Sequence, residues 1–278
     1  MGRRLTAKQF IFYGALSLFV VLALLPYLWI VSTALKDFSE IFTIPIRLIP
    51  RHITFDNFKA VIYGQMHFSQ KFMNSLIVTI ATTLLSLVLS LPCAYALTRF
   101  KMKGKRFLLQ TILISQMIPI VVLLIPLYIV IVKLGLINTF SSLVIANLTF
   151  SVPFAVWILY GFFTRLPISV EESAMIDGCS RFQILVRIVL PSAMPGIAAS
   201  AAYTFISAWQ EYIFALTFID SQRKFTLPVA LTSYIGQYGT QWGNMMAASL
   251  LVTLPVLVLF FGVQTLMVKG LTAGAVKG

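Results

Sequence analysis

Six long runs without any Asp, Glu, Lys, Arg or His constrain this chain more than any other feature. They cover residues 9–35, 72–98, 107–132, 134–164, 188–210 and 225–268. A helix needs about 20 mostly apolar residues to cross the hydrocarbon core of a bilayer, so each run is long enough to span it. With 59% hydrophobic and 10% charged residues, the chain has little left to build a water-exposed domain. The sequence therefore predicts an all-α, polytopic membrane protein.

We predict one transmembrane helix in each run, within a single domain that covers residues 1–278. The last run is trimmed at its start because residues 237–244 are rich in glycine and polar side chains. The first run has 27 residues, whereas the apolar core of a secretory signal has about 7–15, so we interpret it as a retained anchor. The predicted spans lie near 12–33, 74–98, 107–132, 140–163, 196–219 and 246–268.

Prolines recur within these runs, at Pro26, Pro92, Pro119, Pro126, Pro153 and Pro255. Each proline removes a backbone donor and is expected to bend its helix, although prolines are also generally more frequent in membrane helices than in soluble ones. Taken together, they favour a bundle that moves over a rigid anchor.

Basic residues flank the spans unevenly. Arg3, Arg4 and Lys8 precede the first span and residues 99–106 hold five basic side chains, whereas the next connection holds only Lys133. The excess of Lys and Arg in cytoplasmic loops predicts that both termini are cytoplasmic, with 13 basic residues on that side and 8 outside. The net charge of +13 therefore reflects topology, and we predict no nucleic-acid binding because the basic residues lie at membrane borders.

The sequence offers no metal site and no disulfide framework. Cys93 and Cys179 fall on different predicted elements, in lipid or on the cytoplasmic side, so we expect both to be free thiols. His52 and His67 lie in the first outer loop without a cysteine or a spaced set of carboxylates. We interpret them as solvated loop residues.

The chain also lacks the means to couple transport to energy by itself. A phosphate-binding loop requires G-x-x-x-x-G-K-[ST], but Gly104-Lys105 is followed by Arg106. Ion-coupled carriers usually bury ionisable residues or pair broken helices from two repeats, and these spans are nearly free of charge. We therefore expect no enzyme activity and no cofactor on this chain. A channel or ion-coupled carrier that acts without an ATPase remains an alternative.

Glu211 is the one acid inside a predicted span. Ionisable residues at such depth generally serve function, so Glu211 is a candidate to line a polar cavity. The alternative is a structural role near the outer interface, where it would be hydrogen-bonded within the bundle. Asn147 and Gln116 are weaker candidates of the same kind, since a neighbouring helix can satisfy one amide.

An ordered polar segment, residues 165–194, separates the fourth and fifth spans. It contains three acids and three arginines together with a helical spacing of apolar residues. Such a segment cannot lie inside a bilayer, and it is too regular for a mere connector. We predict that it lies in the cytoplasm and is bound by another protein.

This segment resembles the signature of permease subunits in binding-protein-dependent ABC importers, which reads E-A-A, three residues, G, nine residues, I-x-L-P. The signature falls on Glu172, Ser173, Ala174, Gly178, Ile188, Leu190 and Pro191, with Ser173 where the family usually has alanine. The likeness covers nearly the whole chain and extends to Trp209-Gln210-Glu211 and to the tail from Gly270. It is most like the carbohydrate-uptake branch, and within it the smaller, maltose-type permease, where Gln210 replaces a common asparagine.

The resemblance implies that Glu172, Ser173, Ala174, Asp177, Gly178, Ile188, Leu190 and Pro191 couple the chain to an ATPase. Residues 169–178 would form a short coupling helix with Ser169 as its N-cap. Gly178 would end this helix with a positive φ. Ala174 and Gly178 would let it sit closely in a cleft of the ATPase subunit, and Ile188, Leu190 and Pro191 would fix the helix that leads back to the membrane.

The resemblance also implies the partners. These are a second permease in a heterodimer, two ABC ATPase subunits that carry ATP and Mg²⁺, an extracytoplasmic solute-binding protein, and membrane lipid. The chain would be a non-catalytic subunit in the cell (inner) membrane of a bacterium or archaeon. Its solute would be a sugar of oligosaccharide size, and the alternative is an importer of another solute such as an amino acid or polyamine.

Two sets of residues are expected to meet the solute or its carrier. Asn147, Gln210 and Glu211 are candidates for the solute path. Tyr234, Gln237, Tyr238 and Trp242 lie in the outer segment 220–244, where they either contact the binding protein or form an interfacial aromatic belt.

Overall fold

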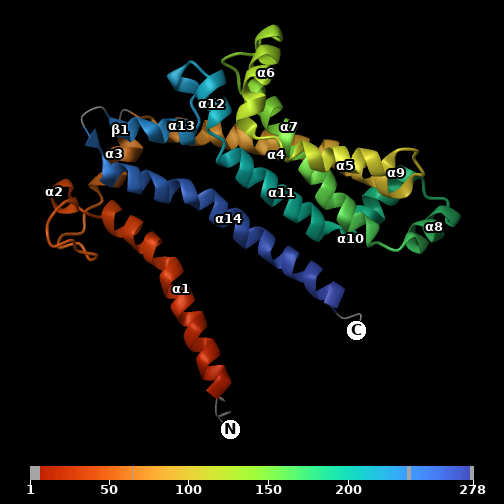
Figure 1. The fold of residues 1–278 in the computed structure, drawn as a ribbon, viewed down its shortest axis with the longest axis horizontal. Coiled ribbons are helices and arrows are strands. Elements are labelled where there is room, and N and C mark those ends of the chain that lie inside the picture. The colour runs from red at the N-terminus through yellow and green to blue at the C-terminus, as the bar shows by residue number, and fades with distance from the viewer. Residues whose placement is uncertain (1–6, 65, 237–238, 276–278) are drawn as a thin grey trace. The chain divides into compact units, whose positions relative to one another are not determined.

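The computed structural model describes residues 7–64, 66–236 and 239–275 (Figure 1), and the side chains of residues 8–64, 66–236 and 239–266. Its helices are α1 (Ala7–Ala34), α2 (Phe38–Ile41), α3 (Asp56–Tyr63), α4 (Phe68–Arg99), α5 (Lys105–Ser115), α6 (Ile120–Lys133), α7 (Phe140–Thr164), α8 (Ile168–Ile176), α9 (Arg181–Ile184), α10 (Leu190–Ser192), α11 (Met194–Trp209), α12 (Ile213–Phe218), α13 (Leu227–Leu231) and α14 (Trp242–Ala275). A π-helix, η1 (Leu185–Val189), and two 3-10 turns, η2 (Gln222–Lys224) and η3 (Thr232–Tyr234), lie between them. Strands β1 (Ile235–Gly236) and β2 (Gly239–Thr240) pair antiparallel, with Ile235 opposite Thr240. Apart from this hairpin, the regular secondary structure of the described residues is helical, which confirms the predicted all-α class.

The chain divides into two compact units. The first comprises Met1–Ser69 and Leu231–Leu254, and the second comprises Gln70–Ala230 and Pro255–Gly278.

In the first unit, the loop after α1 folds back onto the end of that helix. Lys36 is only 2% exposed, and its ammonium donates to the carbonyl of Arg47. The Asn57 amide of α3 donates to the carbonyls of Ala34 and Lys36 at 2.9 and 2.8 Å. Side chains 8–29 of α1 are all exposed, as suits a helix that is surrounded by lipid.

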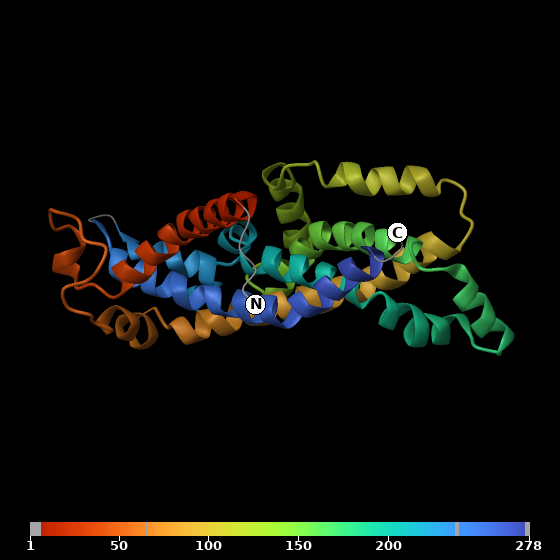
Figure 2. The ribbon, with the colours of Figure 1, turned by 90° about the horizontal axis from the view of Figure 1, so that it is seen from below.

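In the second unit, α7 and α11 lie side by side (Figures 1 and 2). Their close approach depends on Gly196, where a Cβ would lie 2.4 Å from the ring of Phe162. Small residues at helix contacts are typical of membrane bundles, where packing drives association. Two apolar clusters fill this unit, one around Phe214 and Phe218 and one around Tyr95 and Phe163.

Four described helices are long and apolar enough to cross a membrane. They cover Lys8–Ala34, Phe68–Arg99, Phe140–Thr164 and Trp242–Leu266, and two bent pairs of helices would raise the number to six. The four helices lie over the predicted spans 12–33, 74–98, 140–163 and 246–268.

The predicted span 107–132 is not one helix. It is divided into α5 and α6, which are bent by 100° at residues 116–119, and Figure 2 shows this sharp turn. Pro119 lacks the backbone N–H and disfavours the helical conformation at the residue before it, which favours a break between α5 and α6 at this point. The other prolines, Pro26, Pro92, Pro126, Pro153 and Pro255, all lie inside continuous helices.

The predicted span 196–219 is interrupted as well. Helix α11 ends at Trp209, and α12 begins at Ile213. Before α11, the predicted loop 165–194 contains the helical stretch Arg181–Ser192, which meets Met194–Trp209 at an angle of 79°.

Candidate functional site

Helix α8 forms the first half of the segment that carries the signature residues. Pro167 occupies its N-cap position with an extended backbone, and no side chain caps the helix there. The prediction of Ser169 as N-cap is therefore wrong, because the fixed φ of Pro167 begins the helix two residues earlier. Ser169 lies inside α8, where its carbonyl accepts a hydrogen bond from the Ser173 hydroxyl at 3.0 Å.

The end of α8 follows the prediction. Gly178 has a φ of +82°, a left-handed conformation that glycine adopts at little cost. The Cys179 N–H donates to the Ala174 carbonyl at 2.9 Å, and the Gly178 N–H donates to the Met175 carbonyl at 3.1 Å. These two bonds form a Schellman motif, which satisfies the last carbonyls of the helix. Gly178 therefore fixes the direction in which the chain leaves α8.

Helix α8 has one face against its own chain and one face exposed. Ala174 is 8% exposed and packs in the apolar cluster around Tyr95 and Phe163. The expectation that Ala174 faces an ATPase cleft is thus corrected, because its small side chain seats α8 on the permease itself. The exposed face presents Glu172, Ser173, Ile176 and Asp177, and Ile176 is 87% exposed. This face is available to another protein.

A buried ion pair anchors the inner face of α8. The Arg99 Nε donates to Glu171 Oε1 at 2.6 Å, and the two side chains are 4% and 3% exposed. The Tyr95 hydroxyl donates to Glu171 Oε2 at 3.0 Å, and Arg99 Nη2 donates to the Leu166 carbonyl at 3.3 Å. Sequence reasoning missed this site, because the basic residues 99–106 indicated only topology and Glu171 is one of three acids in segment 165–194.

The second half of the signature lies beyond the turn after α8. A capping box begins α9, in which the Ser180 hydroxyl accepts from the Gln183 N–H and the Gln183 side chain accepts from the Ser180 N–H. Ile188 lies in the π-helix η1 and Leu190 begins α10, and both pack against the apolar cluster around Tyr95 and Phe163. Pro191 is exposed. These residues fix the helical stretch that leads to α11.

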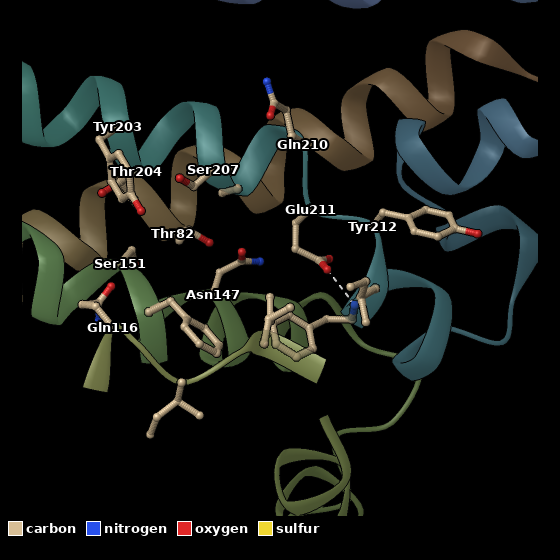
Figure 3. Close-up of a pocket in the computed structure, with 16 residues that line it drawn as sticks. Thr82, Gln116, Asn147, Ser151, Tyr203, Thr204, Ser207, Gln210, Glu211 and Tyr212 are labelled. Carbon is tan, nitrogen blue, oxygen red and sulfur yellow. Dashed lines mark hydrogen bonds between the residues drawn. The ribbon is translucent and has the colours of Figure 1, made fainter. Parts of the chain in front are cut away.

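A cavity of about 590 Å³ lies in the second unit (Figure 3). Its lining comes from α4, the α5–α6 connection with the first residue of α6, α7, α11, the α11–α12 connection and the start of α12. It consists of Thr82, Gln116, Ile118, Ile120, Asn147, Phe150, Ser151, Tyr203, Thr204, Ser207, Ala208, Gln210, Glu211, Tyr212, Ile213 and Phe214. The two helix breaks and all three candidate solute-path residues thus meet at this cavity.

Glu211 has a structural role that accounts for its position. Its Oε1 accepts from the Phe214 N–H at 2.6 Å, and its Oε2 accepts from the Ala215 N–H at 3.0 Å. The carboxylate therefore caps the start of α12, where backbone N–H groups have no partners within the helix. Gln210 is exposed, and its side chain points away from Asn147 and Glu211 in Figure 3.

Several buried polar atoms on the cavity lining lack hydrogen-bond partners within the part of the chain that the structure describes. They are Thr82 Oγ1, Gln116 Nε2, Ser151 Oγ and Thr204 Oγ1. Asn147, by contrast, donates from its amide to the Leu143 carbonyl at 2.8 Å. Buried polar groups normally have partners, so the three hydroxyls and the Gln116 amide leave unused hydrogen-bonding capacity beside the cavity.

The described aromatic candidates of segment 220–244 differ in accessibility. Tyr234 is 6% exposed and its burial raises the pKa of the phenol to about 12, so its ring is not free to contact a partner. Trp242 is 38% exposed. Gln237 and Tyr238 lie outside the described residues.

Comparison with known proteins identifies one family and several similar permease proteins. Residues 86–273 match the family described as "Binding-protein-dependent transport system inner membrane component". The chain is 36% identical over 278 residues to the diacetylchitobiose uptake system permease protein DasC of Streptomyces coelicolor, across the full length of both. It is 34% identical to the trehalose transport system permease protein SugB of Mycobacterium tuberculosis, covering 98% of this chain and 99% of that one.

Among solved structures, one chain of a bacterial ABC transporter involved in the import of the acidic polysaccharide alginate has a similar fold. The TM-score is 0.80 at 22% identity, with 95% of this chain and 99% of that chain covered.

Proposed function

The chain belongs to the family of inner-membrane components of binding-protein-dependent transport systems, and from this premise we propose that it forms part of the path of a carbohydrate importer. It is a non-catalytic, multi-pass permease of an ABC importer. Two of its relatives are named for diacetylchitobiose and trehalose, which are both disaccharides. The proposed solute is accordingly a disaccharide or a longer oligosaccharide.

The exposed face of α8 is the proposed docking surface for an ABC ATPase subunit. The observation that carries this proposal is the division of α8 into a face anchored by Glu171 and Ala174 and a face that exposes Glu172, Ile176 and Asp177. An exposed Ile176 next to acidic side chains suits a protein contact with an apolar centre and a polar rim. Two ATPase subunits would bind ATP and Mg²⁺, and a second permease would complete the path.

We also propose that α8 lies on the cytoplasmic side, together with both termini. The contact between Arg99 and Glu171 supports this orientation, because it brings the basic segment 99–106 to the same end of the second unit as α8. At the other end of α4, the Lys71 ammonium donates to the carbonyl of Gln222, and the Asn74 amide donates to the carbonyl of Arg223 at 2.8 Å. Residues 222–225 would therefore face outward.

The cavity is the proposed solute path, and its chemistry favours a sugar over an amino acid or polyamine. Glu211 is the only formally charged residue among the described residues that line it, and both of its oxygens cap α12. A polyamine would need carboxylates, and an amino acid would need partners for both of its charges. Hydroxyl and amide groups, including that of Asn147, together with aromatic rings suit an uncharged, hydroxyl-rich solute.

Solute would reach the cavity from an extracytoplasmic binding protein. Of the two candidate contact residues that the structure describes, Trp242 is the more accessible, and Gln237 and Tyr238 remain candidates from the sequence. A Trp242→Ala variant should raise the concentration of loaded binding protein needed for half-maximal uptake. An unchanged requirement would favour the aromatic belt at the membrane interface.

The test is reconstitution of the purified complex in liposomes with its binding protein, followed by measurement of uptake of radiolabelled disaccharides. Uptake should require ATP and all partners, and amino acids or polyamines should not compete. Uptake by this chain without ATP or partners would establish the channel or ion-coupled carrier instead. Within the complex, Thr82→Val should weaken uptake, whereas Thr83→Val should not, because the Thr83 hydroxyl bonds to the Thr79 carbonyl and lies off the cavity.

A further inference from the structure

We propose that Tyr95, Arg99 and Glu171 form a rigid joint that carries movements of α8 into α4. This inference rests on the proposed docking of α8 to an ATPase. The three residues are defined here as the Arg99 joint, and they act as positioning residues that touch neither nucleotide nor solute.

The geometry of the Arg99 joint connects α4 to α8 at two successive points. Arg99 donates from Nε to Glu171 in the first turn of α8, and from Nη2 to the Leu166 carbonyl just before α8. Tyr95, one turn earlier on α4, occupies the second oxygen of Glu171. The planar guanidinium fixes the direction of its bonds, so the joint restrains rotation as well as separation.

Covalent connections alone would not hold α8 in this way. The link from α7 to α8 runs through Arg165–Pro167, which is not helical, and the link to α9 turns at Gly178. Ala174 adds an apolar contact on the same face of α8 as Glu171, but apolar contacts permit sliding. The Arg99 joint adds a directional contact.

The joint leads directly to the cavity. Helix α4 is continuous from Phe68 to Arg99 and carries Thr82 on the cavity lining. Thr82 and Arg99 are 17 residues apart, which corresponds to about 26 Å along a helix. A displacement of α8 by an ATPase would thus reach the cavity through one helix.

Burial of the pair supports a role beyond stability. Removing two charges from water costs enough that apolar residues of similar size often stabilise a protein as well or better. An ion pair with both side chains under 5% exposed therefore gains its value from a defined geometry. A joint that transmits the movement of α8 to α4 requires such a defined geometry.

The experiment measures movement at the cavity without needing the identity of the solute. A Thr82→Cys reporter is introduced into the complete complex with its ATPase, and its labelling rate by a membrane-permeant maleimide is measured with and without ATP and vanadate. Mass spectrometry separates this thiol from Cys93 and Cys179. With an intact joint, trapping should change the labelling rate, because a movement of α4 would change the surroundings of this thiol.

Joint variants are then compared on this reporter. Glu171→Gln and the apolar pair Arg99→Met/Glu171→Leu should abolish the nucleotide effect while the ATPase still co-purifies and hydrolyses ATP. Tyr95→Phe, which removes one hydroxyl and keeps the fold, should reduce the effect by less. Asp56→Asn is the matched control, because it breaks an ion pair with Lys59 whose side chains are 77% and 69% exposed.

Three results would overturn the joint. The nucleotide effect could persist at full size in Glu171→Gln, or it could return in the apolar pair, which would mean that packing alone transmits. Alternatively, Glu171→Gln and Tyr95→Phe could lose bound ATPase to the same extent as they lose the nucleotide-dependent change in labelling. That result would mean that these residues only hold α8 in place. Failure of the proposed function looks different, because no ATPase would then co-purify with the parent chain.

Discussion

Glu211→Ala tests whether the acid in the cavity is a helix cap or a solute contact. The substitution removes the acceptors of the Phe214 and Ala215 N–H groups, which lie 2.6 and 3.0 Å from the carboxylate. Loss of a capping side chain costs about 0.5–2 kcal/mol. Each buried donor left without a partner costs about 1–3 kcal/mol.

Because two donors lose their acceptors, we expect Glu211→Ala to lower the free energy of unfolding by about 2–6 kcal/mol. Glu211→Gln retains one carbonyl oxygen as an acceptor and should cost about half as much. The assay is equilibrium unfolding of the purified permease in mixed micelles titrated with a denaturing detergent, with uptake measured in parallel. Gln210→Ala is the matched control, because this neighbouring side chain is exposed and should cost less than about 0.5 kcal/mol.

The two variants should lose uptake only in proportion to the loss of folded protein. The capping role would be refuted if Glu211→Gln were as stable as the parent chain but did not transport. That result would assign the carboxylate to the solute.

Three further predictions concern α8 and the packing of α7 on α11. Gly178→Asp should leave the chain folded and inserted, at a cost of about 1–2 kcal/mol for the left-handed backbone. It should abolish the stimulation of ATP hydrolysis by the permease, and stimulation at the parent level would contradict the docking role. Ile176→Asp should weaken co-purification of the ATPase without changing the stability of the permease, because this side chain is 87% exposed, and a loss of stability would place it inside the fold. Gly196→Leu should destabilise the permease by about 1–3 kcal/mol through overpacking, whereas Gly161→Leu, which meets nothing within 4 Å, should be tolerated in the same unfolding assay.

The sequence predicts the apolar helices well because a membrane span is a local property. Length and the absence of charge identify helices such as α1 and α7 directly. The breaks at 116–119 and 210–212 are not local in this sense. A proline disrupts bonds wherever it occurs, and neighbouring groups decide whether the helix bends or ends, so Pro119 could not be told from Pro126.

The candidate site likewise contains some residues that local sequence rules predict and others that only the folded structure brings together. The role of Gly178 could be predicted, because a glycine directly after a short helix commonly ends it with a positive φ. The prediction of Ser169 as N-cap was wrong, because the nearby Pro167 occupies that position instead. The bond between Arg99 and Glu171 joins residues 72 positions apart. No periodicity in the sequence points to that bond. The role of Glu211 likewise required the position of α12.

The central claim, that this chain is a permease driven by a separate ATPase through α8, is tested most directly by mild-detergent purification of the tagged chain from its native membrane. Mass spectrometry of the parent chain should identify a second permease and an ABC ATPase. The ATPase should be lost when Gly178→Asp is purified in the same way. Recovery of the parent chain alone, or only with copies of itself, would contradict the account and favour a channel or carrier that acts without partners.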